Sequence, residues 1–288
     1  MPGAMQRPCF FWCQVRMRSF FSLALLCSLL LCGCFRQAYY VSPFNGMTSP
    51  YRTVPLHDDS VKAASYLNLQ LFTGEANQQG RDRKVAASLD FSRSHNFGVF
   101  QAYYGLGFTA GNYHAVGTDS ALTASGLYYG SLSPRRANYF FGGAGADVGA
   151  NVVAPFNGGE WRIFGVEASV RQEFGDYVRA RKAVPDSQGA VVIPDKFFGS
   201  SGVYSELVLD AGGGSLVGLR MSTGRAFGSK YRNLDVSVDT AFGSAIIRFN
   251  YFNVNLHYTH ERFTTYVQFG TAGKSDHVLA GVNYRLGR

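Results

Sequence analysis

Residues 85–92 read Val-Ala-Ala-Ser-Leu-Asp-Phe-Ser, and this stretch decides the fold class. Its odd-numbered side chains are all apolar, whereas its even-numbered ones are alanine, serine or aspartate. Because successive side chains of a β-strand point to opposite faces, an alternation with a period of two predicts a strand with one apolar and one polar face. The clearest further segments with this pattern are 66–71, 100–108, 164–171, 217–222 and 278–286.

The same alternation is expected in two architectures. In a soluble sandwich the apolar face is buried, whereas in a transmembrane barrel it meets lipid and the polar face lines the lumen. The segments are longer than the five or six residues usual in soluble sheets, about the length that a tilted membrane strand needs. Aromatic pairs such as Tyr103-Tyr104 and Phe140-Phe141 recur near strand ends, as an interfacial girdle requires. The sequence therefore predicts an all-β, antiparallel, up-and-down transmembrane barrel.

The expected barrel has twelve strands, an even number as bacterial single-chain barrels require. The ninth has the weakest pattern, so ten strands remain the alternative. Residues 178–197 do not fit the scheme, because strand parity places this long segment on the periplasmic side. Either it hides another strand around residues 191–193, or the strand assignment slips there. The expected strands are 64–74, 84–93, 97–110, 119–131, 137–150, 161–177, 199–210, 215–224, 234–240, 244–258, 262–271 and 277–287.

The N-terminal segment predicts export. Arg16 and Arg18 precede an apolar stretch over residues 20–31, and a small residue, Gly33, stands before Cys34. A basic region, an apolar region and a small residue before the cut form an export signal. The run 31–34, Leu-Cys-Gly-Cys, resembles the bacterial lipobox, which implies lipidation of Cys34. We therefore expect a lipoprotein signal peptide over residues 1–33, which starts at Met1 or Met17.

Residues 34–62 are predicted to be the lipidated N-terminus and a flexible tether, and residues 63–288 the barrel. The tether contains Pro43, Pro50 and Pro55 and has no hydrophobic period. Fully extended it would reach up to about 90 Å, so it could also fold back and plug the lumen.

From about residue 63 onward the chain resembles a bacterial outer-membrane β-barrel, and with Cys34 it resembles the barrel lipoproteins of Bacteroidota. This resemblance implies a Gram-negative outer-membrane location and an anchor of fatty acyl chains such as palmitate. The partners it implies are outer-membrane lipids and the lipoprotein-processing and barrel-assembly machinery, with the chain a monomer. Phe35 stands where an aspartate would retain an enteric lipoprotein at the inner membrane, so outer-membrane sorting is permitted.

Composition excludes several function classes. Removal of the signal takes away three arginines and no acids, so the net charge falls by three from +8. The remaining excess of positive charge is small and is spread along the chain without a cluster of lysine and arginine. This gives no case for nucleic-acid binding. All five cysteines lie within the first 34 residues, so the mature chain has no disulfide framework and no thiolate metal site. His257 and His260 lie on opposite faces of a strand and cannot share a metal ion. No cofactor is expected.

The polar faces carry both signs of charge. Charged side chains on a lipid face would cost about 2–4 kcal/mol near the midplane, so we expect them inside, in ion pairs that close a small barrel. A porin would instead line an open path with one sign. The expected lumenal charges are Asp147, Glu167, Arg171, Glu173, Glu206, Asp210, Arg220 and Arg285.

Three functions are compatible with this reading. The favoured one is a non-enzymatic, lipid-anchored barrel with a structural, adhesive or small-solute-passage role. The second is a soluble, lipid-tethered periplasmic barrel or sandwich that binds a hydrophobic ligand, as lipocalins do. The third is a barrel-embedded lipid hydrolase that combines His257, Glu206 and a serine. The sequence itself predicts no catalytic residue and no metal ligand.

Overall fold

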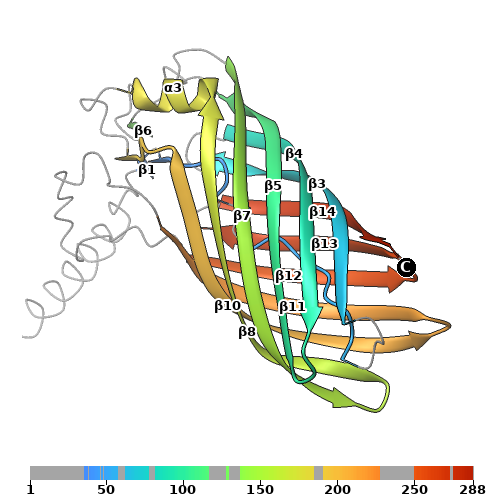
Figure 1. The fold of residues 1–288 in the computed structure, drawn as a ribbon. Helices are drawn as coiled ribbons and strands as arrows, with labels where there is room; N and C mark the ends of the chain where they lie inside the picture. Colours follow the sequence, from blue (N-terminus) through green and yellow to red (C-terminus); the bar gives the residue numbers. More distant parts are fainter. Residues whose placement is uncertain are drawn as a thin grey trace, which may run out of the picture.

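The computed structural model describes residues 36–37, 39–45, 47, 49–57, 62–77, 82–116, 128–129, 137–184, 191–227, 250–272 and 275–287. Its main element is a closed barrel in which every strand pairs with its neighbours in antiparallel fashion (Figure 1). The barrel strands are β3 (Ala63–Asn77), β4 (Asp82–Asn96), β5 (Phe100–Ala115), β7 (Ala137–Phe156), β8 (Gly159–Gly175), β10 (Phe197–Gly212), β11 (Ser215–Phe227), β12 (Asn250–His260), β13 (Phe263–Ala272) and β14 (Ser275–Leu286).

Five short elements lie outside the barrel wall. They form two small parallel pairs, β1 with β6 and β2 with β9, and one short helix. These elements are β1 (Arg36–Gln37), β2 (Tyr39–Tyr40), β6 (Tyr128–Tyr129), α3 (Asp176–Lys182) and β9 (Val191–Val192). Among the described residues, no helix combines the length and the apolar character needed to cross a bilayer.

The barrel has ten strands, so the ten-strand alternative is confirmed and the favoured count of twelve is wrong. Strand β5 pairs directly with β7, and β11 pairs directly with β12. Of the expected strands 119–131 and 234–240, only Tyr128–Tyr129 is described, and it pairs with β1 outside the wall; the rest lies outside the described residues. One strand fewer than expected precedes residue 178, so the connection that contains most of residues 178–197 lies at the opposite end of the barrel from the one expected. This removes the conflict over that segment.

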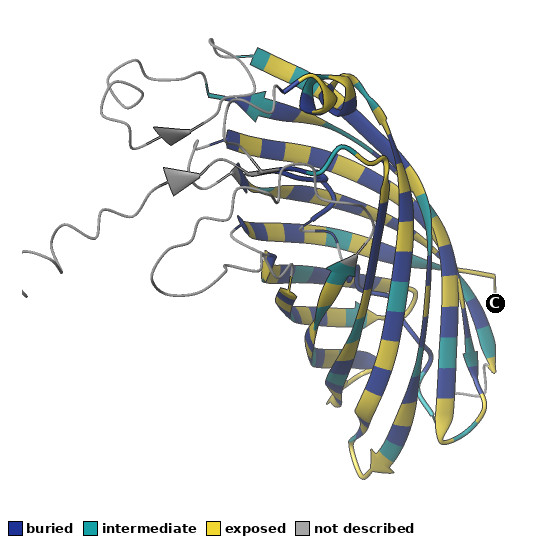
Figure 2. Ribbon diagram, turned by 90° about the vertical axis from the view of Figure 1, so that its left-hand side faces the viewer, coloured by how far each residue is buried: buried dark blue, intermediate teal, exposed yellow. Residues whose placement is uncertain are grey.

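The apolar faces point outward. Strand β4 alternates between buried and exposed positions along almost its whole length, and the same banding covers the other strands in Figure 2. The predicted apolar faces are exposed, with Leu106 as much as 67 % accessible, whereas Ser88, Asp90 and Ser92 are buried inside. A water-soluble sandwich or lipocalin requires the opposite arrangement. The structure is therefore a transmembrane β-barrel, and the soluble alternative is wrong.

The two ends of the barrel differ. Connections 97–99, 157–158, 213–214 and 261–262 are tight turns, and both ends of the barrel chain, Ala63 and Leu286, lie with them. We call this the short-turn end. The opposite end carries connections 78–81, 116–136, 176–196, 228–249 and 273–274, which include α3 and β9. We call it the long-connection end (Figure 1).

Candidate functional site

The lumen is occupied by the chain's own N-terminal part. We define the lumen segment as residues 40–57, of which 46 and 48 are not described. Figure 1 shows it, in blue, running inside the barrel from the α3 side towards the end where the C-terminus lies. Phe44 and Arg52 are completely buried. The flexible tether expected for this stretch is therefore fixed inside the barrel, as in the folded-back alternative.

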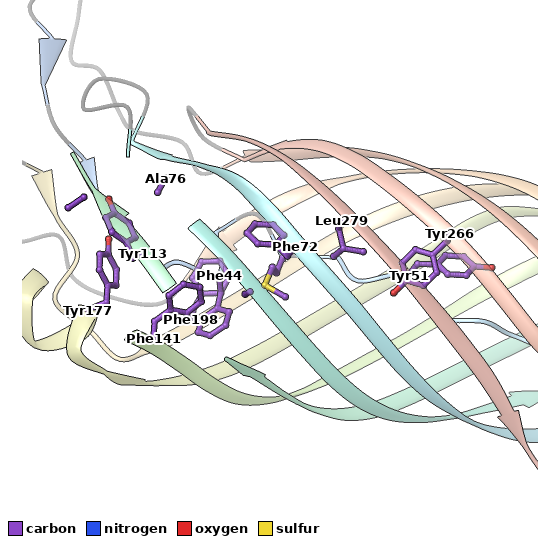
Figure 3. Close-up of a cluster of buried hydrophobic side chains, with 13 residues drawn as sticks. Phe44, Tyr51, Phe72, Ala76, Tyr113, Phe141, Tyr177, Phe198, Tyr266 and Leu279 are labelled. Carbon is purple, nitrogen blue, oxygen red and sulfur yellow. The ribbon is translucent and has the colours of Figure 1, made fainter. Parts of the chain in front are cut away.

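The part of the lumen nearer the long-connection end contains a cluster of buried hydrophobic side chains. Phe44, Met47 and Tyr51 of the lumen segment pack against inward-facing barrel side chains in one continuous cluster (Figure 3). The rings of Phe44 and Phe141 meet edge to face, with centroids 5.8 Å apart. Edge-to-face contacts of this kind stabilise by about 0.5–1.5 kcal/mol beyond the burial of the rings. This cluster contains Tyr177 of α3 and the barrel residues Phe72, Ala76, Ala86, Tyr113, Ala115, Phe141, Phe198, Tyr266 and Leu279.

Arg52 joins the lumen segment to the wall through a two-point contact with Asp147. Its Nε donates to Oδ2 of Asp147 at 2.9 Å and its Nη2 to Oδ1 at 2.7 Å, while Asp90 lies 3.4 Å away. A two-point guanidinium–carboxylate contact fixes orientation as well as charge. A Cβ atom at Gly107 would lie 1.7 Å from Asp90 Oδ1, so this glycine leaves the space that Asp90 occupies. Two acids from β4 and β7 thus hold one arginine of the lumen segment.

Glu167 of β8 forms a second polar centre. Its carboxylate accepts hydrogen bonds from Ser49 of the lumen segment and from Arg220 of β11. The hydroxyl of Tyr251 also donates to it at 3.2 Å. The Arg220 guanidinium stacks over the Tyr204 ring at 3.6 Å, which is a cation–π contact. Glu167 therefore connects three strands with the lumen segment.

A third centre surrounds Glu206 of β10. Arg162 Nη1 donates to Glu206 Oε2 at 3.0 Å, and the Tyr51 hydroxyl donates to Oε1 at 3.3 Å. His257 Nε2 lies 2.9 Å from Oε1, and the His257 ring stacks on the Tyr51 ring with centroids 4.7 Å apart. Arg162 also lies 2.8 Å from Glu160. This centre ties the middle of the lumen segment to β8, β10 and β12.

Barrel side chains also satisfy the backbone of the lumen segment. Its irregular course forms no ladder with the wall, and a buried peptide group without a partner costs free energy. Ser94 Oγ donates to the Thr53 carbonyl at 2.8 Å, and Gln101 Nε2 donates to that of Pro55 at 2.9 Å. Arg162 Nη2 donates to the Val54 carbonyl at 3.0 Å. The lumenal face thus carries donors at the positions where this segment presents acceptors.

Helix α3 closes one side of the long-connection end. The hydroxyl of Tyr177 donates to the Val41 carbonyl at 2.9 Å, and the Arg181 Nη2 donates to Glu173 Oε2 at 2.9 Å. Burial raises the pKa of Tyr177, so its hydroxyl stays protonated and remains a donor. The start of the lumen segment is therefore held by an element of the 176–196 connection.

Several lumenal rings lie over glycines. A Cβ atom at Gly165 would lie 2.3 Å from Cζ of Tyr204, the residue directly opposite on β10. Small residues on the polar faces thus make room for rings that fill the lumen. The directly opposed pairs of this kind are Tyr103 with Gly149, Tyr204 with Gly165, His257 with Gly218 and Tyr266 with Gly281.

The structure buries six of the eight charges predicted to point inward. These six are Asp147, Glu167, Arg171, Glu173, Glu206 and Arg220. Arg285 is half-buried near the short-turn end. Asp210 is exposed at the β10–β11 hairpin, where it lines the mouth of the lumen and accepts a hydrogen bond from the Gly212 amide at 2.8 Å. A β-bulge between Asp210 and Gly212 interrupts the strict alternation there.

Sequence reasoning missed several of the charges that matter most. Arg52 lies in an irregular stretch without strand alternation, so the sequence pattern does not indicate which way its side chain points. Arg162 and Glu160 flank Trp161 in an alternating run and could have been placed inside by the same rule as Glu167. Arg181 is completely buried on a helix that the strand pattern did not anticipate.

The lumen contains little that points to catalysis. The structure brings His257 and Glu206 together, as the hydrolase reading required, but neither ring nitrogen of His257 has a serine as hydrogen-bond partner among the described residues. Within the same part of the chain, no group of three or more histidine, cysteine, aspartate or glutamate side chains could hold a metal ion. His257 is buried and His260 exposed, which confirms that they occupy opposite faces.

An open vestibule lies at the short-turn end. It has a volume of about 600 Å³, and its lining includes Tyr51, Pro55 and His57 of the lumen segment. Both signs of charge surround it, with Arg262 and Arg285 beside Glu160 and other acids. The lumen segment forms part of the lining, so this vestibule leads up to the segment rather than past it.

No protein-family model and no curated protein sequence matches the chain. Solved structures are similar to it over most of its length. The translocator domain of the autotransporter NalP from Neisseria meningitidis is 10% identical, with a TM-score of 0.40 over 78% of this chain and 89% of that domain. The COG4313 outer membrane channel from Pseudomonas putida F1 is 8% identical, with a TM-score of 0.40 over 85% and 100%. The KdgM porin is 10% identical, with a TM-score of 0.27 over 76% and 98%.

Proposed function

We propose that this chain is a non-enzymatic outer-membrane β-barrel lipoprotein, anchored through Cys34, whose lumen is closed by its own N-terminal segment. The burial of the lumen segment, with Arg52 held between Asp147 and Asp90, carries this proposal. In this state the barrel is a structural membrane component. Small solutes pass only when the segment leaves its contacts.

The outer surface supports the membrane part of the proposal. Large apolar side chains cover every strand of the barrel, and the closed wall leaves no unpaired strand edge. In lipid, each unsatisfied backbone group costs several kcal/mol, so a sheet can span the bilayer only as a closed barrel. A lipid-facing apolar surface around a charged, hydrogen-bonded interior is the arrangement that a bilayer stabilises. Outer-membrane lipids and the barrel-assembly and lipoprotein-processing machinery are the partners that this location requires, with the chain as a monomer.

The contents of the lumen support closure. The wall contributes a hydrophobic cluster and three polar centres, at Asp147, Glu167 and Glu206, and each of these contacts the lumen segment. Arg52, Arg162, Arg181 and Arg220 each form an ion pair with a lumenal acid, so charges of both signs line the described lumen. The open space of about 600 Å³ is a vestibule at one end.

Planar-bilayer conductance tests the proposal. The purified full chain is compared with a variant in which a Gly/Ser sequence of equal length replaces residues 40–57. We expect little steady conductance from the full chain and a stable open conductance from the variant. The matched control carries the same kind of replacement in connection 228–249, which joins the directly paired strands β11 and β12, and is expected to behave like the full chain.

Two outcomes would overturn the proposal. An open conductance of the unaltered chain equal to that of the variant would show that the segment does not close the lumen. Recovery of the Cys34→Ala chain in the soluble fraction, without detergent, would show that the barrel does not reside in a membrane. Boiled and unboiled samples on a gel establish that each variant is a folded barrel before its conductance is compared.

A further inference from the structure

The lumen segment has a defined direction through the barrel. At the long-connection end, β1 pairs with β6 of connection 116–136, and β2 pairs with β9 of connection 176–196. At the short-turn end, the Asn96 side-chain amide donates to the carbonyls of Leu56 and His57 at 2.7 and 3.1 Å. The His57 amide donates to Glu160 at 2.6 Å. The chain therefore enters at the long-connection end, crosses the barrel and leaves at the short-turn end, where β3 begins.

The two ends of an outer-membrane barrel face different compartments. Short turns lie on the periplasmic side and longer loops on the outside. In this chain the short-turn end also carries both ends of the barrel chain, Ala63 and Leu286. The long-connection end, with α3 and β9, is then the outer face. The described part nearest the N-terminus, Arg36–Gln37, lies at that outer face.

We propose that the mature N-terminus of this protein is displayed at the cell surface, so that the lipid on Cys34 inserts in the outer leaflet. This inference rests on the proposed function, because it takes the barrel to be in the outer membrane and Cys34 to be the lipidated residue. Cys34 precedes Arg36 by two residues, so it lies within about 7 Å of the β1–β6 pair along the chain. A periplasmic anchor would need the chain to return through a lumen that the segment already fills.

This topology places a requirement on assembly. The segment side chains inside the lumen, such as Phe44 and Arg52, are completely buried, so the finished barrel has no room for acyl chains to pass beside them. The wall must therefore close around the segment after the N-terminus has reached the outer side. The pairing of β14 with β3, the last and first strands of the barrel, is the contact that completes the ring.

Epitope accessibility on intact cells tests the proposed topology in the full chain. One peptide epitope is inserted between Phe35 and Arg36. The same epitope is inserted between Val184 and Pro185 as the outer-face control, and between Asn157 and Gly158 as the periplasmic control. Antibody binding is measured by flow cytometry before and after permeabilisation of the outer membrane. We expect the first two epitopes to bind antibody on intact cells and the third to bind it only after permeabilisation.

The outcomes separate this inference from the proposed function. Labelling at 184 but not at 35 on intact cells overturns the surface N-terminus and leaves the barrel in place. Labelling at 157 but not at 184 on intact cells shows that the barrel has the reverse orientation, and this result also overturns the surface N-terminus. Absence of all three from the membrane fraction refutes the proposed function itself.

The inserted epitope could disturb folding of the barrel, and a comparison of boiled and unboiled samples on a gel detects this. A second probe without an insertion is used in that case. Gln37→Cys then replaces the inserted epitope, because the mature chain has no other free thiol once Cys34 is lipidated. A membrane-impermeant maleimide should label it on intact cells. Asn157→Cys is the matched control and should react only after permeabilisation, and the reverse pattern contradicts the inference.

Discussion

Arg52 and Asp147 meet in a two-point contact inside the barrel, with Nε–Oδ2 and Nη2–Oδ1 distances of 2.9 and 2.7 Å. The arginine belongs to the irregular lumen segment and the aspartate to β7, so one ion pair joins the part of the chain without regular structure to the wall. Its arginine is completely buried. A charge removed from water in this way is tolerated only when it is paired and hydrogen-bonded.

Removal of one partner from this pair should be costly. We expect Arg52→Ala to destabilise the folded barrel by about 3–5 kcal/mol, because Asp147 and Asp90 would be left as uncompensated buried charges. The measurement is the temperature at which the unboiled gel band of the folded barrel disappears. Arg179→Ala is the matched control, because the Arg179–Asp176 pair on α3 is exposed and such pairs contribute about 0–1 kcal/mol. Equal transitions for the two variants would contradict the role assigned to Arg52.

The space at Gly107 should be needed for the Asp90 carboxylate. A methyl group there would lie 1.7 Å from Oδ1 of Asp90, so Gly107→Ala must displace the acid that faces Arg52. We expect a loss of about 1–3 kcal/mol, the usual cost of overpacking, read from the same thermal gel assay. Ala87→Val adds bulk on the exposed face of β4 and serves as control. A Gly107→Ala barrel as stable as this control would show that the wall accommodates the methyl group freely.

A charge on the outer face should impair membrane insertion. Leu106 lies in the middle of β5 with 67 % of its surface accessible. Leu106→Arg is expected to cost about 2–4 kcal/mol in a bilayer near the midplane, whereas a soluble protein would tolerate arginine at so exposed a site. The yield of folded barrel in the membrane fraction measures this effect, with Leu106→Val as the conservative control. Unchanged insertion of the arginine variant would argue against a lipid-facing β5.

Loss of the lipid should not release the protein. We expect the Cys34→Ala chain to remain in the membrane after carbonate extraction, because the apolar outer face of the barrel is stabilised by lipid without any acyl anchor. The readout is the partition of the chain between pellet and supernatant. A periplasmic lipoprotein whose barrel is soluble, extracted in parallel after the equivalent cysteine substitution, is the control and should appear in the supernatant.

The His257–Glu206 contact should be structural. We expect His257→Ala to lower the thermal stability of the barrel, because its ring stacks on Tyr51 and lies 2.9 Å from Glu206. Purified membranes that carry the variant should hydrolyse phospholipid and lipid A at the same rate as membranes that carry the unaltered chain. A lipid-hydrolysing activity that disappears with His257, while the folded gel band persists, would instead favour the hydrolase reading.

The strand alternation was readable because it is a local property. A period of two at residues 85–92 fixes which side chains share a face, and the burial of Ser88, Asp90 and Ser92 agrees with it. The same local rule placed Glu167, Glu206 and Arg220 inside. Asp210 lies at the end of β10, where it is exposed and lines the vestibule. The rule overcounted strands, because alternation does not reveal that β5 pairs directly with β7 and β11 with β12.

By itself, the sequence determined the strand faces and the all-β class, since these follow from side-chain order along an extended backbone. Only the tertiary structure decided that the barrel closes with ten strands and that residues 40–57 lie inside it. Strand number depends on which edges pair, and the partners of Arg52 come from β4 and β7, far along the chain. An irregular segment has no period that reveals its surroundings. Its place is set by the hydrogen bonds and charges that the closed wall presents to it.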